Sequence, residues 1–138
     1  MTESTAVLVF ARAPVPGAAK TRLMPALSAD GAARASAALT RRALRTAVEA
    51  SLGAVELWCA PDCTHPFFTG CRERFAIALH AQSGRDIGAR MADAFDHALT
   101  RHDRVVLIGA DAVSLQAADL IAAADALTSH DAVFAPAE

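Results

Sequence analysis

Short apolar runs alternate with longer amphipathic stretches along this chain. The runs of strand length occupy residues 6–10, 55–60, 77–81 and 104–108, and a further one begins at 132–134. Uninterrupted apolar runs are typical of parallel strands that are covered on both faces. Alternation of such strands with helices predicts an α/β fold with a mainly parallel sheet and right-handed crossovers. We expect the strand order 3-2-1-4, with 132–134 adding an edge strand.

The amphipathic stretches predict helices over residues 28–52, 87–101 and 115–127. Ser28, Asp86 and Ser114 stand at their starts, where short polar side chains cap helices. Gly53 is a plausible stop for the first helix. Residues 64–74 lack a clear period, and a short helix above Phe67 and Phe68 is one interpretation.

The predicted helix over residues 28–52 has two distinct faces. Apolar side chains recur at helical spacing at Leu39, Ala43, Leu44, Ala47 and Val48. We expect this stripe to pack on the sheet. The charged side chains are Arg34, Arg41, Arg42, Arg45 and Glu49. We expect these five to be mostly solvated.

Composition limits the classes of partner. The 138 residues suit a single domain, and 54% of them are hydrophobic. Aromatic residues make up 5% and tyrosine is absent, so a stacking platform for single-stranded nucleic acid is not expected. The formal net charge of -2 and the pI near 6.2 predict no general attraction to nucleic acid or acidic membranes. Any anion site must therefore be local.

The sequence predicts a cytoplasmic protein without a membrane span. Its first residues lack a signal peptide, and the longest apolar strands, such as 105–108, are too short to cross a bilayer. The cysteines are three in number, Cys59, Cys63 and Cys71. An odd count in this setting predicts free thiols.

The loop after the first strand carries the densest candidate chemistry. Pro16 and Gly17 form a rigid turn, and the polar cluster Lys20, Thr21 and Arg22 follows it. A buried strand that ends in a rigid cationic loop is a common way to hold a phosphate. Cations close to a helix start oppose the helix dipole, which favours a bound anion over ordinary solvated charges.

The predicted strand order brings two further loops to the same edge. Ligands of doubly wound sheets bind at the carboxyl ends of the strands, where the order reverses. There the loop with Lys20 and Arg22 would meet Asp111, which follows the fourth strand, while Gln82 and Arg85 lie in the turn after the third. Cations and a carboxylate at one rim suit a metal-bound phosphate ester.

Each of these residues also has a structural interpretation. Gly17 could serve only the turn that the preceding proline starts. Asp111 could cap the following helix, although Ser114 already fits that role. Arg85 and Arg90 could pair with Asp86.

Other familiar sites are excluded or disfavoured. A Walker A loop needs glycines at positions 14 and 19, where this chain has Pro14 and Ala19. The spacing of Cys59, Cys63, His65 and Cys71 is irregular for zinc, and buried small side chains are the favoured interpretation. The serines lack a G-x-S-x-G elbow, and the histidines have no triad partners at recognisable spacing.

Several segments carry a family resemblance. Residues 10–17, FARAPVPG, with KTRL at 20–23, look like the opening motif of a bacterial family of GT-A-like transferases. This family includes glycosyltransferases and radical-SAM- or selenodomain-associated transferases. Residues 82–91 resemble its Q-x-G-x-D-L-G-x-R-M block, residues 108–111 its I-G-S-D block, and residues 132–138 its A-V-x-x-P-A-E run. The resemblance covers nearly the whole chain.

The resemblance implies a three-layer α/β/α nucleotide-diphosphosugar transferase fold. It also implies Mg²⁺ or Mn²⁺ as cofactor, held by Asp111 against a diphosphate. The candidate nucleotide- and phosphate-binding residues are Arg12, Pro16, Gly17, Lys20, Thr21, Arg22, Gln82, Arg85 and Arg90.

Two departures from the family pattern stand out. Ala112 and Val113 replace the usual Cys-Pro after the aspartate, so we expect the turn that aims Asp111 to differ. The family continues beyond residue 138, so we expect these residues to be the N-terminal part of a larger family domain.

The leading functional hypothesis is a metal-dependent, glycosyltransferase-like protein that binds a nucleotide-diphosphate sugar. One alternative is a nucleotidyltransferase that releases pyrophosphate from an NTP. The other is a truncated, non-catalytic nucleotide-binding or assembly module. Because an unfinished sheet exposes an edge strand, we also expect self-association into a homo-oligomer.

Overall fold

The computed structural model describes residues 4–16 and 28–129, which form three layers, a four-stranded parallel sheet between two layers of helices. The strands are β1 (Thr5–Arg12), β2 (Gly53–Ala60), β3 (Ala78–Ala81) and β4 (Arg104–Gly109). Their order is β3-β2-β1-β4, so the predicted fold class and strand order are confirmed. The predicted strand at 132–134 lies outside the described residues.

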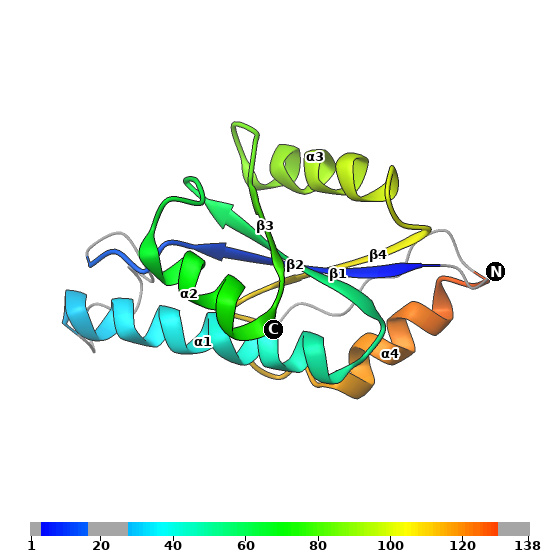
Figure 1. The fold of residues 1–138 in the computed structure, drawn as a ribbon, viewed down its shortest axis with the longest axis horizontal. Coiled ribbons are helices and arrows are strands. Elements are labelled where there is room, and N and C mark those ends of the chain that lie inside the picture. Colours follow the sequence, from blue (N-terminus) through cyan, green and yellow to red (C-terminus); the bar gives the residue numbers. More distant parts are fainter. Residues whose placement is uncertain (1–3, 17–27, 130–138) are drawn as a thin grey trace.

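Helices cover both faces of the sheet. They are α1 (Ala29–Glu49), α2 (Pro66–Phe75), α3 (Ile87–Leu99) and α4 (Ala117–Ala126). Figure 1 shows α1, α2 and α4 on one face and α3 alone on the other. In the part of the chain that the structure describes, no helix combines the length and the apolar character needed to cross a membrane.

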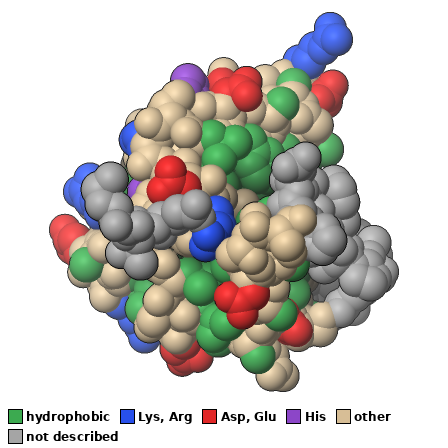
Figure 2. Space-filling view, turned by 90° about the vertical axis from the view of Figure 1, so that its right-hand side faces the viewer, with side chains coloured by type: hydrophobic (Ala, Val, Ile, Leu, Met, Phe, Trp, Pro, Cys, Tyr) green, Lys and Arg blue, Asp and Glu red, His purple; other side chains and the backbone are tan. Residues whose placement is uncertain are grey.

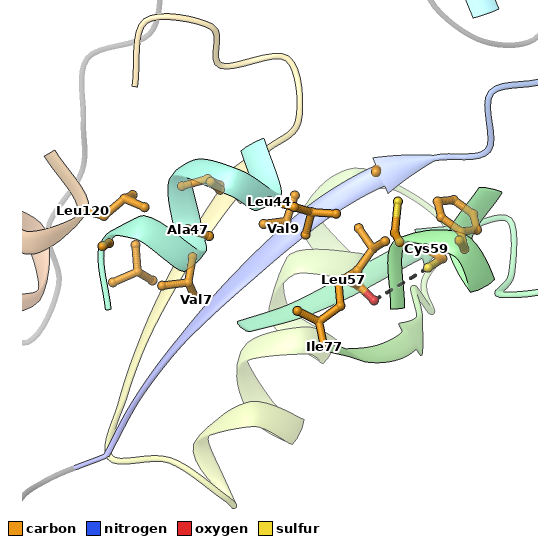
Figure 3. Close-up of a cluster of buried hydrophobic side chains, with 14 of the residues drawn as sticks. Val7, Val9, Leu44, Ala47, Leu57, Cys59, Ile77 and Leu120 are labelled. Carbon is orange, nitrogen blue, oxygen red and sulfur yellow. Dashed lines mark hydrogen bonds between the residues drawn. The ribbon is translucent and has the colours of Figure 1, made fainter. Parts of the chain in front are cut away.

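The apolar strands bury two clusters, one on each face. Val7 and Val9 point toward Leu44 and Ala47 of α1 and toward Leu120 of α4 (Figure 3). The intervening side chains of β1 face α3, and they pack there with Trp58, Ala94 and Ala98. Because successive strand side chains alternate between faces, a central strand that is apolar throughout requires this double cover.

Two of the three predicted helix N-caps, Ser28 and Asp86, are confirmed. The Ser28 hydroxyl accepts a hydrogen bond from a first-turn amide of α1 at 3.0 Å, and the Asp86 carboxylate does so for α3 at 2.8 Å. The expected cap of α4 at Ser114 is wrong, because that helix begins after Gln116. There the Asp119 carboxylate accepts from the Gln116 amide at 2.9 Å. A carboxylate in the first turn therefore replaces the serine cap.

Some boundaries and faces differ from the predicted ones. Strand β1 continues through Arg12, α1 ends before Gly53, which opens β2, and α3 stops at Leu99. Val48 is 43% exposed, whereas Ala47 is buried. The reason is that the buried face of α1 runs through Thr40, Leu44 and Ala47, and one further residue turns the side chain by about 100°.

The face of the molecule shown in Figure 2 has no large region of a single charge sign. Figure 2 shows that acidic and basic side chains are interspersed over this end of the molecule, without a continuous patch of either sign. This agrees with a net charge of -2 and leaves local groups as the determinants of ligand binding.

Candidate functional site

The carboxyl ends of β1 and β4 lie side by side. Phe10 pairs with Gly109 in the parallel register, and the Ala110 amide donates to the Phe10 carbonyl at 3.0 Å. Arg12 and Asp111 each lie two residues beyond this pair, and both are exposed. The predicted adjacency of these two strand ends is therefore confirmed, and it places a cation and a carboxylate on neighbouring strand ends.

The beginning of the loop after β1 is held on β2. The Ala13 amide donates to the Ala60 carbonyl at 2.8 Å, and the Val15 amide turns back onto the Ala13 carbonyl at 2.8 Å. Pro16 follows this turn and is exposed. The other candidates of this loop, Gly17, Lys20, Thr21 and Arg22, lie outside the described residues.

Gln82 joins the ends of three strands. Its side-chain amide donates to the Trp58 carbonyl at 2.9 Å and to the Ala11 carbonyl at 3.4 Å. Its backbone amide donates to the Cys59 carbonyl at 2.9 Å. The side chain predicted to bind phosphate thus ties the turn after β3 to β2 and β1, which fixes the spacing of the strand ends.

The turn after β3 is packed tightly against the start of α3. Gly84 has a φ of +144°, and a Cβ there would lie 2.8 Å from the Arg90 amide nitrogen. The Arg90 side chain donates through Nε to the Gly84 carbonyl at 3.0 Å, while Asp86 caps the helix. Arg90 therefore secures the turn rather than pairing with Asp86, and Arg85 is exposed on it.

Asp111 lies in a compact turn that precedes α4. The Val113 amide donates to the Asp111 carbonyl at 2.9 Å, and the Ala112 amide donates to the Gly109 carbonyl at 3.2 Å. Asp111 Oδ1 lies 3.0 Å from the position that a Cβ on Gly109 would take, so the carboxylate is folded back over the end of β4. Since α4 begins after Gln116, the alternative role of Asp111 as its cap is wrong.

Asp111 has the donor chemistry that a hard divalent ion requires. Magnesium is commonly held by one or two carboxylates, with phosphates and water completing its coordination. Among residues 4–16 and 28–129, no group of three or more His, Cys, Asp or Glu side chains is placed to hold a metal by itself.

Asp62, beyond the end of β2, is a second carboxylate at this edge. It accepts hydrogen bonds from the Thr64 hydroxyl at 2.6 Å and from the Thr64 amide at 3.0 Å. These two bonds lower the pKa of Asp62. The Asp62 carboxylate thus stabilises the turn of residues 62–64 that follows β2.

A buried polar cluster beside α3 was not predicted. Glu56 is 2% exposed in β2, where its carboxylate accepts from Trp58 Nε1 at 3.0 Å and binds the Arg101 guanidinium. Burial alone would raise the pKa of Glu56, but the hydrogen bonds from Arg101 and Trp58 outweigh it and lower the pKa. The one available signal was a single charge inside the apolar run 53–60.

Two imidazoles complete this cluster. Nε2 of His80 and of His102 lie 3.6 Å and 3.4 Å from the Glu56 carboxylate. The His80 ring stacks on Trp58 with centroids 4.7 Å apart. Beside them a hollow of about 390 Å³ opens between α3 and β3, lined in part by His80 and Arg101. One side of the cluster is therefore open to water.

The cysteines belong to the core. Cys59 and Cys71 are buried in the cluster under α1 and α2, and Cys59 donates its thiol to the Leu57 carbonyl at 3.6 Å (Figure 3). Burial raises the pKa of both thiols. Cys63 is partly buried, and all three are free. Thiols that remain protonated at neutral pH are poor nucleophiles and poor metal ligands.

Comparisons with known proteins bear on the fold and the family. A family model described as "Uncharacterized protein conserved in bacteria (DUF2064)" matches residues 43–138. A crystal structure from Desulfovibrio desulfuricans G20, described as a "putative nucleotide-diphospho-sugar transferase", is similar with a TM-score of 0.74 and 26% sequence identity. The similarity covers 93% of this chain and 56% of that one, so this chain spans little more than half of the Desulfovibrio protein. No curated protein matches the sequence.

Proposed function

Because this chain belongs to the family of uncharacterized bacterial proteins whose model matches residues 43–138, and shares its fold with the Desulfovibrio protein, we propose that it binds a nucleotide-diphosphate sugar and transfers the sugar to an acceptor. The observation that carries the proposal is that similarity in fold, at a TM-score of 0.74 over 93% of the chain. The proposed site is the carboxyl edge of β1 and β4, which is where ligands of doubly wound sheets bind.

The phosphates would lie over the end of β1. Arg12 ends that strand and is exposed, and Lys20 and Arg22 follow in the same loop. Guanidinium and ammonium groups form charge-assisted hydrogen bonds with phosphate oxygens. Pro16 and Gly17 would shape the loop, and Thr21 would add a hydroxyl donor.

The turn after β3 would take two roles. Arg85 is exposed there and could reach an anionic ligand at the edge. Gln82 and Arg90 already donate to main-chain carbonyls. These bonds favour a supporting role for both, in which they keep the strand ends and the turn in place.

Asp111 would hold Mg²⁺ or Mn²⁺ through a carboxylate oxygen. When bound, such an ion stabilises the charge that develops on a departing diphosphate. Arg12, Lys20 and Arg22 would neutralise the same charge from the side of β1. The carboxylate and the cations thus bind and orient the leaving group.

A thermal-shift panel of NDPs, NTPs and NDP-sugars, with and without Mn²⁺, tests the proposal. A ligand at about 100 times its Kd adds about 2.7 kcal/mol, which raises the Tm of a domain of this size by about 9 °C. The double variant Lys20→Ala/Arg22→Ala should lose the shift and keep the unliganded Tm. The control Arg34→Ala/Arg45→Ala, on exposed positions of α1, should keep both.

Two outcomes would count against this function. One is the absence of a shift with every nucleotide. The other is an equal loss of shift in both double variants. For a ligand that does bind, release of nucleoside diphosphate from an NDP-sugar with the sugar recovered on an added acceptor, and no pyrophosphate release from an NTP, identifies sugar transfer.

A further inference from the structure

We propose that Arg42 of α1 is a positioning residue for Asp111. It holds the loop of residues 110–115 against α1, so that the Asp111 carboxylate stays over the carboxyl edge of the sheet. The expected effect on metal and nucleotide binding rests on the proposed function, whereas the loop contact does not.

The contact joins two distant parts of the chain. Arg42 Nη1 donates a hydrogen bond to the carbonyl of Val113, 71 positions later in the sequence. Arg42 is exposed, as predicted for a mostly solvated side chain, and the hydrogen bond to Val113 adds a tertiary contact that the sequence did not predict. Neighbouring Arg45 is likewise exposed on α1 and serves as a comparison.

The held residue is itself bonded to Asp111. The Val113 amide donates to the Asp111 carbonyl at 2.9 Å, and the Leu115 amide donates to the Ala112 carbonyl at 3.2 Å. These bonds make residues 111–115 a compact turn. When the guanidinium fixes the Val113 carbonyl, it therefore restrains the main chain of Asp111 as well.

The loop has little room to move toward α1. Ala43 of α1 and Ala110 and Leu115 of the loop line a cavity of about 10 Å³, close to the space of one water molecule. Figure 1 shows the connection from β4 to α4 running beside α1. The Arg42 hydrogen bond opposes movement of the loop away from the helix.

Gly109 makes room for the Asp111 carboxylate at the end of β4. Asp111 Oδ1 lies 3.0 Å from the position of a Cβ on Gly109, which is closer than most real Cβ contacts. The missing side chain leaves room for the carboxylate over the end of β4. Gly109 thus gives the Asp111 side chain its space, and the Arg42 hydrogen bond restrains the main chain.

The experiment compares Arg42→Met, Arg42→Lys and the matched control Arg45→Met in the full chain. First, hydrogen exchange of the Val113 and Leu115 amides is measured without ligand. We expect exchange to be roughly tenfold faster in Arg42→Met, unchanged in Arg45→Met and intermediate in Arg42→Lys, because lysine keeps a donor.

Second, the binding of UDP and GDP is titrated with Mn²⁺ and with EDTA. We expect the Mn²⁺ midpoint to rise roughly tenfold in Arg42→Met, while affinity in EDTA stays the same, since only the metal ligand is displaced. A general loss of structure would weaken both. Arg42→Lys should restore part of the midpoint.

The outcomes separate this proposal from the function on which it rests. Equal loop exchange in Arg42→Met and Arg45→Met would overturn it. So would faster loop exchange with an unchanged Mn²⁺ midpoint, because Arg42 would then hold the loop without positioning Asp111. If the wild-type protein binds neither nucleotide with Mn²⁺, the proposed function is wrong, and loop exchange alone decides whether Arg42 holds the turn.

Discussion

The Glu56 carboxylate is buried in β2, and the Arg101 guanidinium that follows α3 covers it with two hydrogen bonds. The two side chains differ in exposure, since the Glu56 side chain is buried and that of Arg101 is 40% exposed. Loss of the arginine would leave a buried carboxylate short of partners, whereas loss of the carboxylate would leave a guanidinium that water can reach. The pair should therefore respond asymmetrically to substitution.

We predict that Arg101→Met destabilises the protein by about 2–4 kcal/mol, and Glu56→Gln by about 1 kcal/mol. The double variant should be more stable than Arg101→Met alone, since it removes the uncompensated charge. Urea unfolding monitored by circular dichroism measures all three. Equal losses in the two single variants, or additive losses in the double variant, would contradict this assignment.

Acidification should destabilise the fold in two stages. Burial lowers the pKa of His80 from its usual 6.5, and Arg101 and His97 lower it further against the opposing charge of Glu56. A lowered folded-state pKa means that the unfolded chain binds the proton first, so stability falls as the pH drops through and below 6.5. The pKa of Glu56 also lies below its usual 4.5, which adds a second loss below that pH.

Chemical unfolding across about pH 2.5 to 8 checks both stages, with His80→Gln as the comparison. The variant should lose the upper stage and keep the lower one. If His80→Gln still loses stability as the pH drops below 6.5, that loss belongs to a titratable group other than His80.

The sequence was sufficient for the sheet and insufficient for its polar contacts. Mainly apolar runs located every described strand to within a few residues, because a buried parallel strand tolerates few polar side chains. The short helix α2 (Pro66–Phe75) was left open, since its ten residues span too few turns to show a clear period.

Contacts between distant segments escaped prediction. Glu56 and Arg101 lie 45 positions apart, and Arg42 and Val113 lie 71 positions apart, so no local pattern connects them. Gln82 was expected at the correct edge, but the sequence could not show that its amide donates to the Trp58 carbonyl. Strand order places residues at an edge, whereas the direction of a side chain depends on tertiary packing.

Gln82→Glu tests the strand-end contact. The glutamate would turn a carboxylate oxygen toward two carbonyl oxygens. We therefore predict that the free energy of unfolding falls by about 2 kcal/mol in Gln82→Glu and by about 1 kcal/mol in Gln82→Ala. Ser83→Ala, at the next and exposed position, should be neutral. Urea unfolding measures the stability of these variants, and calorimetry measures their nucleotide affinity. If Gln82→Ala keeps full stability and loses only nucleotide affinity, the glutamine contacts the ligand instead.

Gly84→Ala and Gly70→Ala should shift stability in opposite directions. At Gly84 a Cβ would lie 2.8 Å from the Arg90 nitrogen at a φ of +144°, so we predict a loss of about 2–3 kcal/mol. At Gly70, within α2, a Cβ would meet nothing within 4 Å, so alanine should stabilise by about 0.5–1 kcal/mol. Thermal unfolding distinguishes the two, and a stable Gly84→Ala would contradict the tight packing of this turn.

The central claim is that the carboxyl edge of β1 and β4 binds a nucleotide diphosphate together with a divalent ion at Asp111. Isothermal titration of NDP-sugars into wild type, Asp111→Asn and the control Asp62→Asn tests it most directly. We predict that Mn²⁺ tightens binding at least about tenfold in wild type and Asp62→Asn, and that Asp111→Asn loses this gain but keeps its metal-free affinity. Absence of binding in wild type, or an undiminished Mn²⁺ effect in Asp111→Asn, would contradict the account.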